Sequence, residues 1–325
     1  MGRSKGQKAP SPGELLLQRS NFITMGWVSF LFFVTLLRDI FGVMALYTND
    51  RLAYLIFSNE GAHVALIVSI VALVSGMVPA LRGASVKYVN VPIPNLKSSL
   101  EGFKIAQISD LHIGPFIGAS YSKKVVDTIR GLSPSIVALT GDIFDADYEH
   151  FHRQALPLAG LAEFSKVFFV SGNHEYYWES SKWFALVIQM KMTLLRNENQ
   201  IIDHNGAKIL VGGVVDPAAQ MIGEKPDVVR AGKGNADLKI LLAHQPQIAD
   251  KAASEGFDLQ LSGHTHGGQF FPWTLVVRKV HKYHQGLFKV AEKMWIYVSP
   301  GTGFWGPPVR LGTTPEITLL TLKKA

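Results

Sequence analysis

Five short polar segments follow apolar runs of strand length in the last two-thirds of this 325-residue chain. In chain order they are Asp110–His112, Gly141–Asp142, Gly172–Glu175, His244 and Gly263–His266. Stretches with helical periodicity lie between them, so we expect strands and helices to alternate. Such alternation favours a layered α/β domain in which loops from neighbouring strand ends meet at one edge of a sheet.

The expected strands are rich in Val, Ile, Leu and Phe. They cover residues 103–109, 136–140, 167–171, 209–215, 238–243, 259–262, 295–299 and 317–322. Helices are expected at residues 120–132, 153–164, 180–191 and 248–255. The polar segments therefore stand at the carboxyl ends of predicted strands.

The N-terminal third has a different composition and predicts a membrane anchor. Residues 1–20 are basic and contain two prolines, which predicts a flexible tail. Residues 21–82 contain long apolar runs, including the uncharged eighteen-residue run 64–81, so we expect a two-helix transmembrane hairpin. Residues 83–101 are expected to form an extended linker or an edge strand, and residues 102–325 the soluble domain.

Two features of the first apolar run leave alternatives open. Arg38 and Asp39 interrupt it, and either the span ends near Leu37 with Arg38 reaching the interface, or the pair contacts a polar partner. A cleaved signal peptide is the alternative to a first span. Positive charge flanks the hairpin and only Arg51 lies between the two runs, which predicts a cell-membrane protein with its catalytic domain in the cytoplasm.

Charge and cysteine content restrict the class of function. Of the 32 Lys and Arg, ten lie in residues 1–104 with five acidic residues, so the net charge of +7 is concentrated around the apolar segments. Anionic lipid is the natural partner of such charge. The sequence has no run of basic residues interleaved with aromatic residues, so it does not predict nucleic-acid binding. The chain has no cysteine, which excludes disulfides, thiolate metal sites and a cysteine nucleophile.

The polar segments contain the residue types that bind metal ions. Asp and His together suit Mn²⁺, Fe or Zn²⁺, one carboxylate such as Asp142 can bridge two cations, and Asn173 offers a neutral oxygen. His174 is then free to act as an acid, with Asp145 placed to orient its ring. Each segment alone is more simply explained as a turn or a buried histidine, but their combination predicts a metal site.

The pattern D-x-H, G-D-x-x-D, G-N-H-[DE], H, G-H-x-H resembles the calcineurin-like metallophosphoesterase superfamily over about residues 103–320. The longer wording, including SGNHEYY and LSGHTHGGQ, is similar to its membrane-associated bacterial branch, which includes phosphodiesterases and UDP-diacylglucosamine pyrophosphatases. This resemblance implies a four-layer α-β-β-α sandwich. It also implies two divalent ions, with Mn²⁺ favoured over Fe or Zn²⁺.

The resemblance further implies how the residues divide between the two ions. One metal would be held by Asp110, His112, Asp142 and His266, and the other by Asp142, Asn173, His244 and His264. A water bridging both ions would be deprotonated at neutral pH and attack phosphorus. His174, supported by Asp145, would stabilise the phosphoryl charge or protonate the leaving oxygen.

Other residues near the last polar segment are candidate substrate contacts. Arg310 could pair with a phosphate and Gln269 could contact substrate, while Phe304 or Trp305 could face an acyl chain or a base. A packed turn with Arg310 in a structural role is an equal alternative. The apolar stretch 270–277 is expected to be a core strand, with a membrane-touching flap as the alternative.

The expected function is a membrane-anchored phosphodiesterase or pyrophosphatase acting on a lipid-linked or nucleotide-linked substrate. A phosphomonoesterase or nuclease of the same family is one alternative, since the same two-metal core serves all three reactions. A non-catalytic membrane scaffold is the other, but it would have no need of a complete ligand set with His174 and Asp145.

Overall fold

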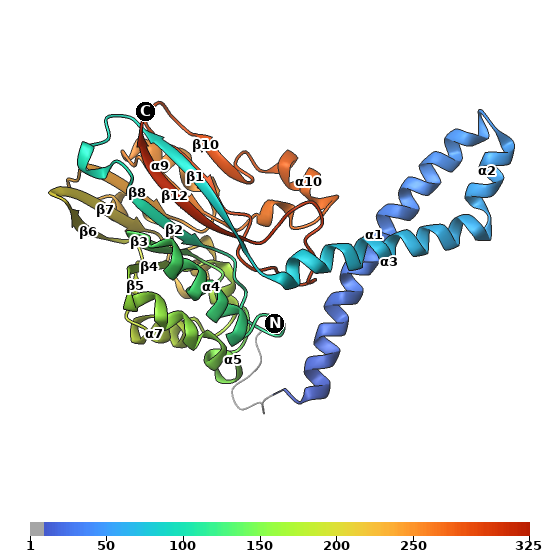
Figure 1. Cartoon of the computed structure of the whole chain (residues 1–325), viewed down its shortest axis with the longest axis horizontal. Helices are drawn as coiled ribbons and strands as arrows, with labels where there is room; N and C mark the ends of the chain where they lie inside the picture. The colour runs from blue at the N-terminus through green and yellow to red at the C-terminus, as the bar shows by residue number, and fades with distance from the viewer. Residues whose placement is uncertain (1–9) are drawn as a thin grey trace.

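The two central layers of the fold are six-stranded β-sheets packed face to face (Figure 1). This computed structural model describes residues 10–325. Helices cover the outer face of each sheet, and a helical hairpin projects from one end. The expected four-layer α-β-β-α sandwich with an N-terminal two-helix hairpin is confirmed.

The first sheet contains three neighbouring parallel strands whose carboxyl ends carry polar segments. Its order is β1 (Ser85–Ile93), β12 (Glu316–Lys324), β2 (Lys104–Ile108), β3 (Ile136–Thr140), β4 (Lys166–Val170) and β5 (Thr193–Leu194). Strand β12 pairs antiparallel with β2 and parallel with β1. Strands β2, β3 and β4 are almost wholly buried, which explains their continuous apolar sequences.

The second sheet has four parallel strands between two antiparallel edges. Its order is β10 (Gly286–Lys289), β11 (Trp295–Val298), β9 (Leu259–Ser262), β8 (Leu238–Leu242), β7 (Ala207–Gly213) and β6 (Glu198–His204). The sequence did not predict β5, β6 or β10. Strand β6 is a mostly exposed edge with a polar sequence, so it lacks the apolar run that marked the other strands.

Most helices of the domain pack on the outer faces of the sheets. Those with more than five residues are α4 (Ala119–Leu132), α5 (Tyr148–Ala155), α7 (Ser180–Gln189), α9 (Ala249–Ser254) and α10 (Trp273–Val280), and the shorter ones are α6 (Asn173–Tyr177) and α8 (Val228–Ala231). The 3₁₀ segments are η1 (Ser98–Leu100), η2 (Leu156–Glu163), η3 (Pro217–Ile222), η4 (Pro246–Ile248) and η5 (His266–Gly268). The expected helix 153–164 is instead α5 followed by η2, because Pro157 cannot donate the next helical hydrogen bond.

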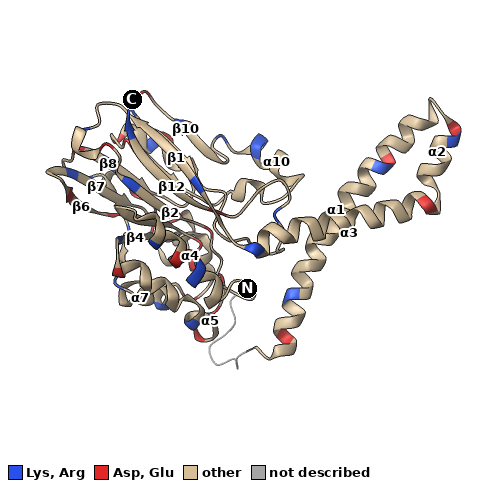
Figure 2. Ribbon diagram, viewed as in Figure 1, with Lys and Arg blue, Asp and Glu red and all other residues tan. Residues whose placement is uncertain are grey.

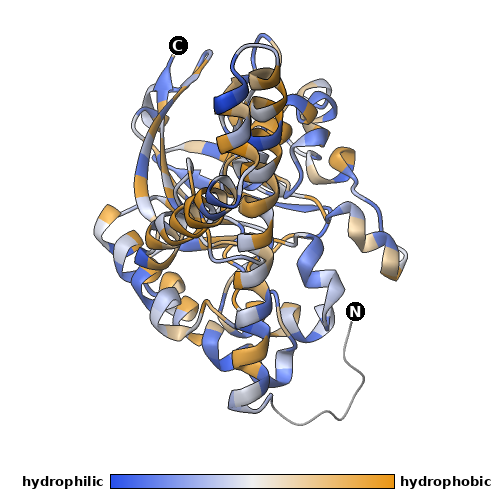
Figure 3. Ribbon diagram, turned by 90° about the vertical axis from the view of Figure 1, so that its right-hand side faces the viewer, coloured by the Kyte–Doolittle hydropathy of each residue, from blue (hydrophilic) through white to orange (hydrophobic). Residues whose placement is uncertain are grey.

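The hairpin consists of α1 (Pro12–Leu46), α2 (Asp50–Phe57) and α3 (Asn59–Arg82). Helices α1 and α3 are long and apolar enough to cross a membrane. Few charged residues lie along them (Figure 2), and hydrophobic residues cover much of their surface (Figure 3). The two helices are joined near the domain by a hydrogen bond from Trp27 Nε1 to Ser69 Oγ of 3.1 Å.

The structure changes two of the expected boundaries. Helix α1 begins at Pro12 behind the N-cap Ser11, so the described end of the expected tail 1–20 is helical, and residues 1–9 lie outside the described part. The Arg19 side chain donates a 2.8 Å hydrogen bond to the Pro115 carbonyl, which holds this helix on the domain. The expected linker 83–101 contains β1, an edge strand that belongs to the first sheet.

The base of the hairpin is packed against the domain. Phe30 and Leu73 form a small apolar cluster with Phe270 and Val309. At Gly76 a side chain would lie 2.5 Å from Val309, and the Gly76 carbonyl accepts a 2.8 Å hydrogen bond from the Arg310 amide. The hairpin and the domain therefore share one packed interface.

Replacing Gly76 with leucine should destabilise this interface. The added side chain overlaps Val309, and overpacking of this kind costs about 1–3 kcal/mol. We expect a lower midpoint of thermal unfolding for the full chain in detergent, measured by intrinsic fluorescence. Val74→Leu, at an exposed position of the same helix, is the control. Equal midpoints for the two variants would contradict the packed interface.

Candidate metal centre

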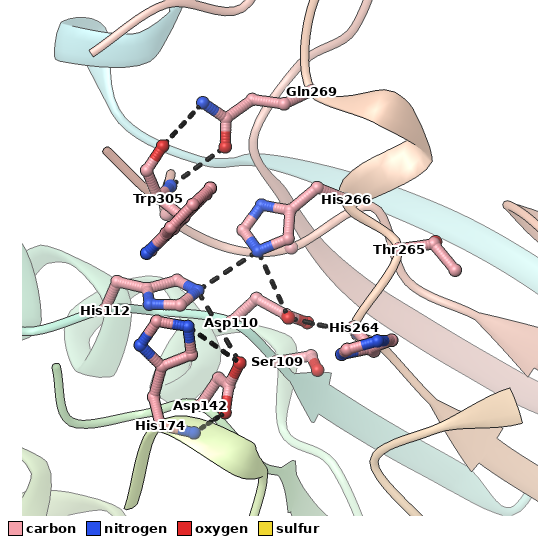
Figure 4. A network of polar contacts seen from close by, with 12 residues as sticks. Ser109, Asp110, His112, Asp142, His174, His264, Thr265, His266, Gln269 and Trp305 are labelled. Atoms are coloured by element: carbon pink, nitrogen blue, oxygen red, sulfur yellow. Dashed lines mark hydrogen bonds and ion pairs between the residues drawn. The ribbon is translucent and has the colours of Figure 1, made fainter. Parts of the chain in front are cut away.

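The five polar segments meet at the carboxyl ends of strands from both sheets (Figure 4). The first sheet provides Asp110 and His112 after β2, Asp142 after β3, and Asn173 and His174 at the start of α6 after β4. The second sheet provides His244 after β8, and His264 and His266 after β9. The site thus lies where the ends of the two sheets converge.

One group of candidate ligands comprises Asp110, His112 and His266, whose ligand atoms lie within 4.8 Å of one another. His266 Nε2 lies 3.3 Å from Asp110 Oδ1 and 3.1 Å from His112 Nε2. All three residues are buried, so their donor atoms face one another instead of solvent. A carboxylate and two imidazoles at this separation form a suitable cation site.

The second group comprises Asp142, His244 and His264, again with ligand atoms within 4.8 Å. Asn173 adjoins it, because its Oδ1 lies 3.0 Å from His264 Nδ1. Asp142 Oδ2 is 3.1 Å from His244 Nε2 and 4.0 Å from His112 Nε2, which places this carboxylate between the two groups. A further group of candidate ligand atoms, from His112, Asp142 and His174, overlaps both sets, and the division of the residues between two ions stays a prediction.

His244 gives an independent test of whether a cation fits. Its Nδ1 donates a 2.8 Å hydrogen bond to the Thr140 carbonyl. In the neutral ring, Nε2 then carries a lone pair that faces the Asp142 carboxylate, and this buried nitrogen has no hydrogen-bond partner. A divalent cation between the two atoms would satisfy both. Metal-bound histidines usually donate a hydrogen bond from the other ring nitrogen, as His244 Nδ1 does here, and this bond fixes the tautomer.

The charges of the site also suit metal binding. Burial lowers the pKa of His264 and of His266 to about 4, and at His264 the charge of His244 adds to this effect. Both imidazoles are therefore neutral at physiological pH. Burial would raise the pKa values of Asp110 and Asp142, but the surrounding histidines outweigh it and lower them. Neutral imidazoles and ionised carboxylates are the forms that bind metal ions.

His244 differs from the other two histidines. Burial lowers its pKa, but the facing carboxylates of Asp142 and Asp110 outweigh burial and raise it. A proton and a metal ion therefore compete for the same Nε2 atom.

The backbone at the candidate ligands is strained. Asp110, His112, Asp142, His264 and His266 have φ between 50° and 70°, and they are five of the eleven described non-glycine residues with positive φ. Each such conformation costs of order 1–3 kcal/mol and persists only where the surrounding structure enforces it. Concentration of this strain at one place indicates a functional site.

Two glycines of the polar segments allow the loops to approach closely. A Cβ at Gly263 would overlap Ser109 Oγ and Asp110 Oδ2, and a Cβ at Gly172 would overlap the Asp142 carboxylate. Only glycine leaves room for these contacts.

His174 and Asp145 form the pair that the sequence predicted. His174 Nδ1 lies 2.6 Å from Asp145 Oδ1, and its Nε2 points into the centre, 3.9 Å from Asp142 Oδ2 (Figure 4). Burial lowers the pKa of His174, but the hydrogen bond with Asp145 and the nearby carboxylates outweigh it and raise the pKa. Asp145 also binds His112 Nδ1 at 3.1 Å, so it orients both rings.

Glu175 has a role that the sequence did not define. Its buried carboxylate accepts hydrogen bonds from the amides of Gly172, Asp142, Ile143 and Phe144, and so joins the loops after β3 and β4. Burial and the Asp142 charge raise its pKa to about 7. The polar motif contained this residue, but no spacing rule identifies which amides it would bind.

The structure contradicts a direct substrate contact by Arg310. Its side chain is 1% exposed, and the guanidinium donates to the carbonyls of Gly303 and His266. Gln269, also expected to contact substrate, is buried, and its amide binds the backbone of Trp305 and Pro307. Both residues position the loops around the centre, because their polar atoms are already bonded within the protein.

The stretch 270–277 is not the expected core strand. Phe270 is buried, but residues 273–280 form helix α10, which has no buried residue. Trp273, Leu275, Val276 and Val280 are exposed. The apolar residues of this stretch therefore lie largely on an exposed surface, and the membrane-touching flap stays a prediction.

The metal content of two variants should distinguish Asp142, which both metal positions would share, from His244, which would bind one ion. His244→Ala should lower the metal content of the purified chain from about two ions to about one, whereas Asp142→Ala should remove both, because Asp142 lies between the groups. Plasma mass spectrometry measures the content. His204→Ala, on the edge strand β6, is the control. Equal losses in the His244 and Asp142 variants would contradict the shared role.

Comparison with known proteins identifies the family. Residues 103–268 match the family described as Calcineurin-like phosphoesterase. A Bos taurus protein named "Transmembrane protein with metallophosphoesterase domain" is 37% identical over 275 residues, covering 80% of this chain and 62% of that protein. The Danio rerio protein of the same name is 35% identical over 272 residues, with the same coverage. This chain thus spans less than two-thirds of their length.

A bacterial relative matches over a greater length. The Campylobacter jejuni protein "Uncharacterized metallophosphoesterase Cj0846" is 32% identical over 325 residues, covering 95% of this chain and 85% of its own. The family uses a centre of two divalent metal ions, for which the two residue groups described above are the candidate ligands. The chain belongs to the calcineurin-like phosphoesterase family.

Proposed function

We propose that this chain is a membrane-anchored phosphodiesterase or pyrophosphatase that requires two divalent metal ions and acts on a lipid-linked or nucleotide-linked substrate. The observation that carries the proposal is a pair of cavities that both reach the metal centre and both include Trp305 in their lining. A phosphorus atom with a substituent on each side would use both cavities. A phosphomonoester would use only one.

The first cavity, the His112 pocket, has a volume of about 310 Å³ and is lined by His112, Asp145, Trp178, Gln18, Phe22 and Trp305. The second, the His264 groove, has a volume of about 430 Å³ and is lined by His264, His266, Met25, Trp273, Val277 and Trp305. The Trp305 ring lies 5.9 Å from the His174 ring and is held by the Gln269 contacts to its backbone. Trp305 therefore lines both cavities beside the candidate acid.

Hydrolysis joins a water oxygen to phosphorus and breaks the bond from phosphorus to the leaving oxygen. Two divalent ions, when held by the two residue groups, would activate the water and offset the phosphoryl charge. The mixed Asp, Asn and His ligands suit Mn²⁺, with Fe or Zn²⁺ as alternatives. His174, fixed through Nδ1 by Asp145, directs Nε2 at the centre and provides the proton for the leaving oxygen.

The hairpin would hold this centre at the surface of the cell membrane. Arg38, within the apolar part of α1, pairs with Asp39 at 2.7 Å, which lowers the cost of placing both charges near lipid. Only Arg51 lies between the two apolar helices, while basic residues flank their other ends. This distribution supports a multi-pass protein with its catalytic domain in the cytoplasm.

The purified full chain with Mn²⁺ should hydrolyse bis-p-nitrophenyl phosphate, and faster than p-nitrophenyl phosphate, because the diester uses both cavities. Asn173→Ala and His264→Ala should each abolish the release of p-nitrophenolate. His204→Ala should retain it. Undiminished activity in the first two variants would refute the assignment of the centre.

His174→Gln should slow reactions with poor leaving groups most. Loss of a general acid typically costs about 10²- to 10⁴-fold, but p-nitrophenolate needs little protonation to leave. We therefore expect a large fall in kcat for a dialkyl phosphate or a nucleotide-linked diester and a small fall for the p-nitrophenyl diester. Equal falls for the two substrates would assign His174 to phosphoryl charge stabilisation instead of leaving-group protonation.

A further inference from the structure

We infer that the His264 groove binds the hydrocarbon chain of a lipid substrate, which enters from the bilayer along helices α1 and α10. The inference rests on the proposed function and specifies its substrate: the scissile phosphorus lies at the metal centre, the apolar chain in the groove and the polar head group in the His112 pocket.

The groove connects the metal centre to the apolar helices. His264 and His266 lie at its inner end, Met25 on the α1 side, and Trp273 and Val277 on the α10 side. The two helices are in contact there, because Trp273 Nε1 donates a 2.9 Å hydrogen bond to Ser29 Oγ and the rings of Phe33 and Trp273 lie 5.5 Å apart. The groove therefore runs between the metal centre and the junction of the two helices.

Helix α10 has the composition of a helix that lies at a membrane surface. Its apolar residues Leu275, Val276 and Val280 are exposed, and the basic residues Arg278 and Lys279 stand in its last turn. A short helix with exposed apolar residues and adjacent cationic charge binds the boundary between head groups and acyl chains. Its position beside α1 puts this surface at the base of the hairpin, next to the apolar span (Figure 1).

The polar side chains that line the groove beside the two histidines already make hydrogen bonds within the protein. Ser29 accepts the Trp273 hydrogen bond, Gln269 binds Trp305 and Pro307, and the Thr265 hydroxyl donates to the His284 carbonyl. The remaining lining between these groups and the two histidines is apolar. A hydrocarbon chain needs no hydrogen-bond partner, so it fits this lining better than a nucleotide does.

Helix α1 sets the direction of the bound lipid. Gln18 and Phe22 line the His112 pocket, and Met25 and Ser29 line the His264 groove. Their spacing of four, three and four residues puts all four on one helical face. Since α1 continues from residue 29 into its exposed apolar part, the chain end of the substrate points toward the span and the head group away from it.

A series of p-nitrophenyl alkyl phosphates tests the inference, because every member has the same leaving group. With the full chain and Mn²⁺ in detergent, kcat/KM should rise about tenfold or more from the ethyl to the octyl diester, since each buried methylene adds to binding. Val277→Glu and Met25→Trp should bring the octyl-to-ethyl ratio near one. Met25→Trp fills the groove without adding a charge, so it still tests the groove if Val277→Glu does not fold.

Val229→Glu is the matched control, because it makes the same substitution at an exposed position of helix α8, away from the groove and from α10, and it should retain the wild-type ratio. Hydrolysis of the ethyl diester without a chain-length effect would overturn the inference and leave the proposed function intact. A chain-length effect that survives in both groove variants, or is lost equally in Val229→Glu, would also overturn it. Absence of ethyl diester hydrolysis by the wild type would refute the proposed function itself.

Discussion

The candidate site depends on the contacts of one side chain, the Asp142 carboxylate. Its Oδ2 faces His244 Nε2 at 3.1 Å and lies about equally far from His112 and His174, while its Oδ1 accepts the His174 amide. Glu175 stabilises the left-handed backbone at Asp142, because its carboxylate accepts hydrogen bonds from the amides of residues 142, 143 and 144. Both candidate metal positions and the candidate acid are thus arranged around a single constrained side chain.

The hairpin and the centre are parts of one packed structure. Helix α3 contacts Val309 through Gly76, and Arg310 in the same loop supports His266. The same loop contains Pro307, which lies against Gly26 of α1 and accepts a hydrogen bond from Gln269. A shift of either helix would therefore move residues that support the centre, which an extended linker, one of the two forms predicted for residues 83–101, would not do.

The sequence predicted the features that depend on local pattern. Asp110, Asp142, His244 and the other candidate ligands stand directly after apolar strands, and parallel pairing brings together those that belong to one sheet. The meeting of the two sheets was implied only by the family resemblance. The roles of Glu175, Gln269 and Arg310 depend on backbone atoms distant in sequence, which no local pattern encodes. Residues 270–277 were predicted as a core strand because apolar composition does not distinguish a buried segment from an exposed one.

The position of α1 relates the anchor to the choice of substrate. In a tethered enzyme the membrane only raises the local concentration of lipid, and the active site can face any direction. Here one face of α1 crosses both cavities, with Phe22 in the His112 pocket and Met25 in the His264 groove. A phosphorus atom between them would have one substituent directed along the helix toward its apolar half and the other toward its N-terminal turns. Under the proposed function, α1 would thereby determine which end of a lipid-linked diester lies in which cavity.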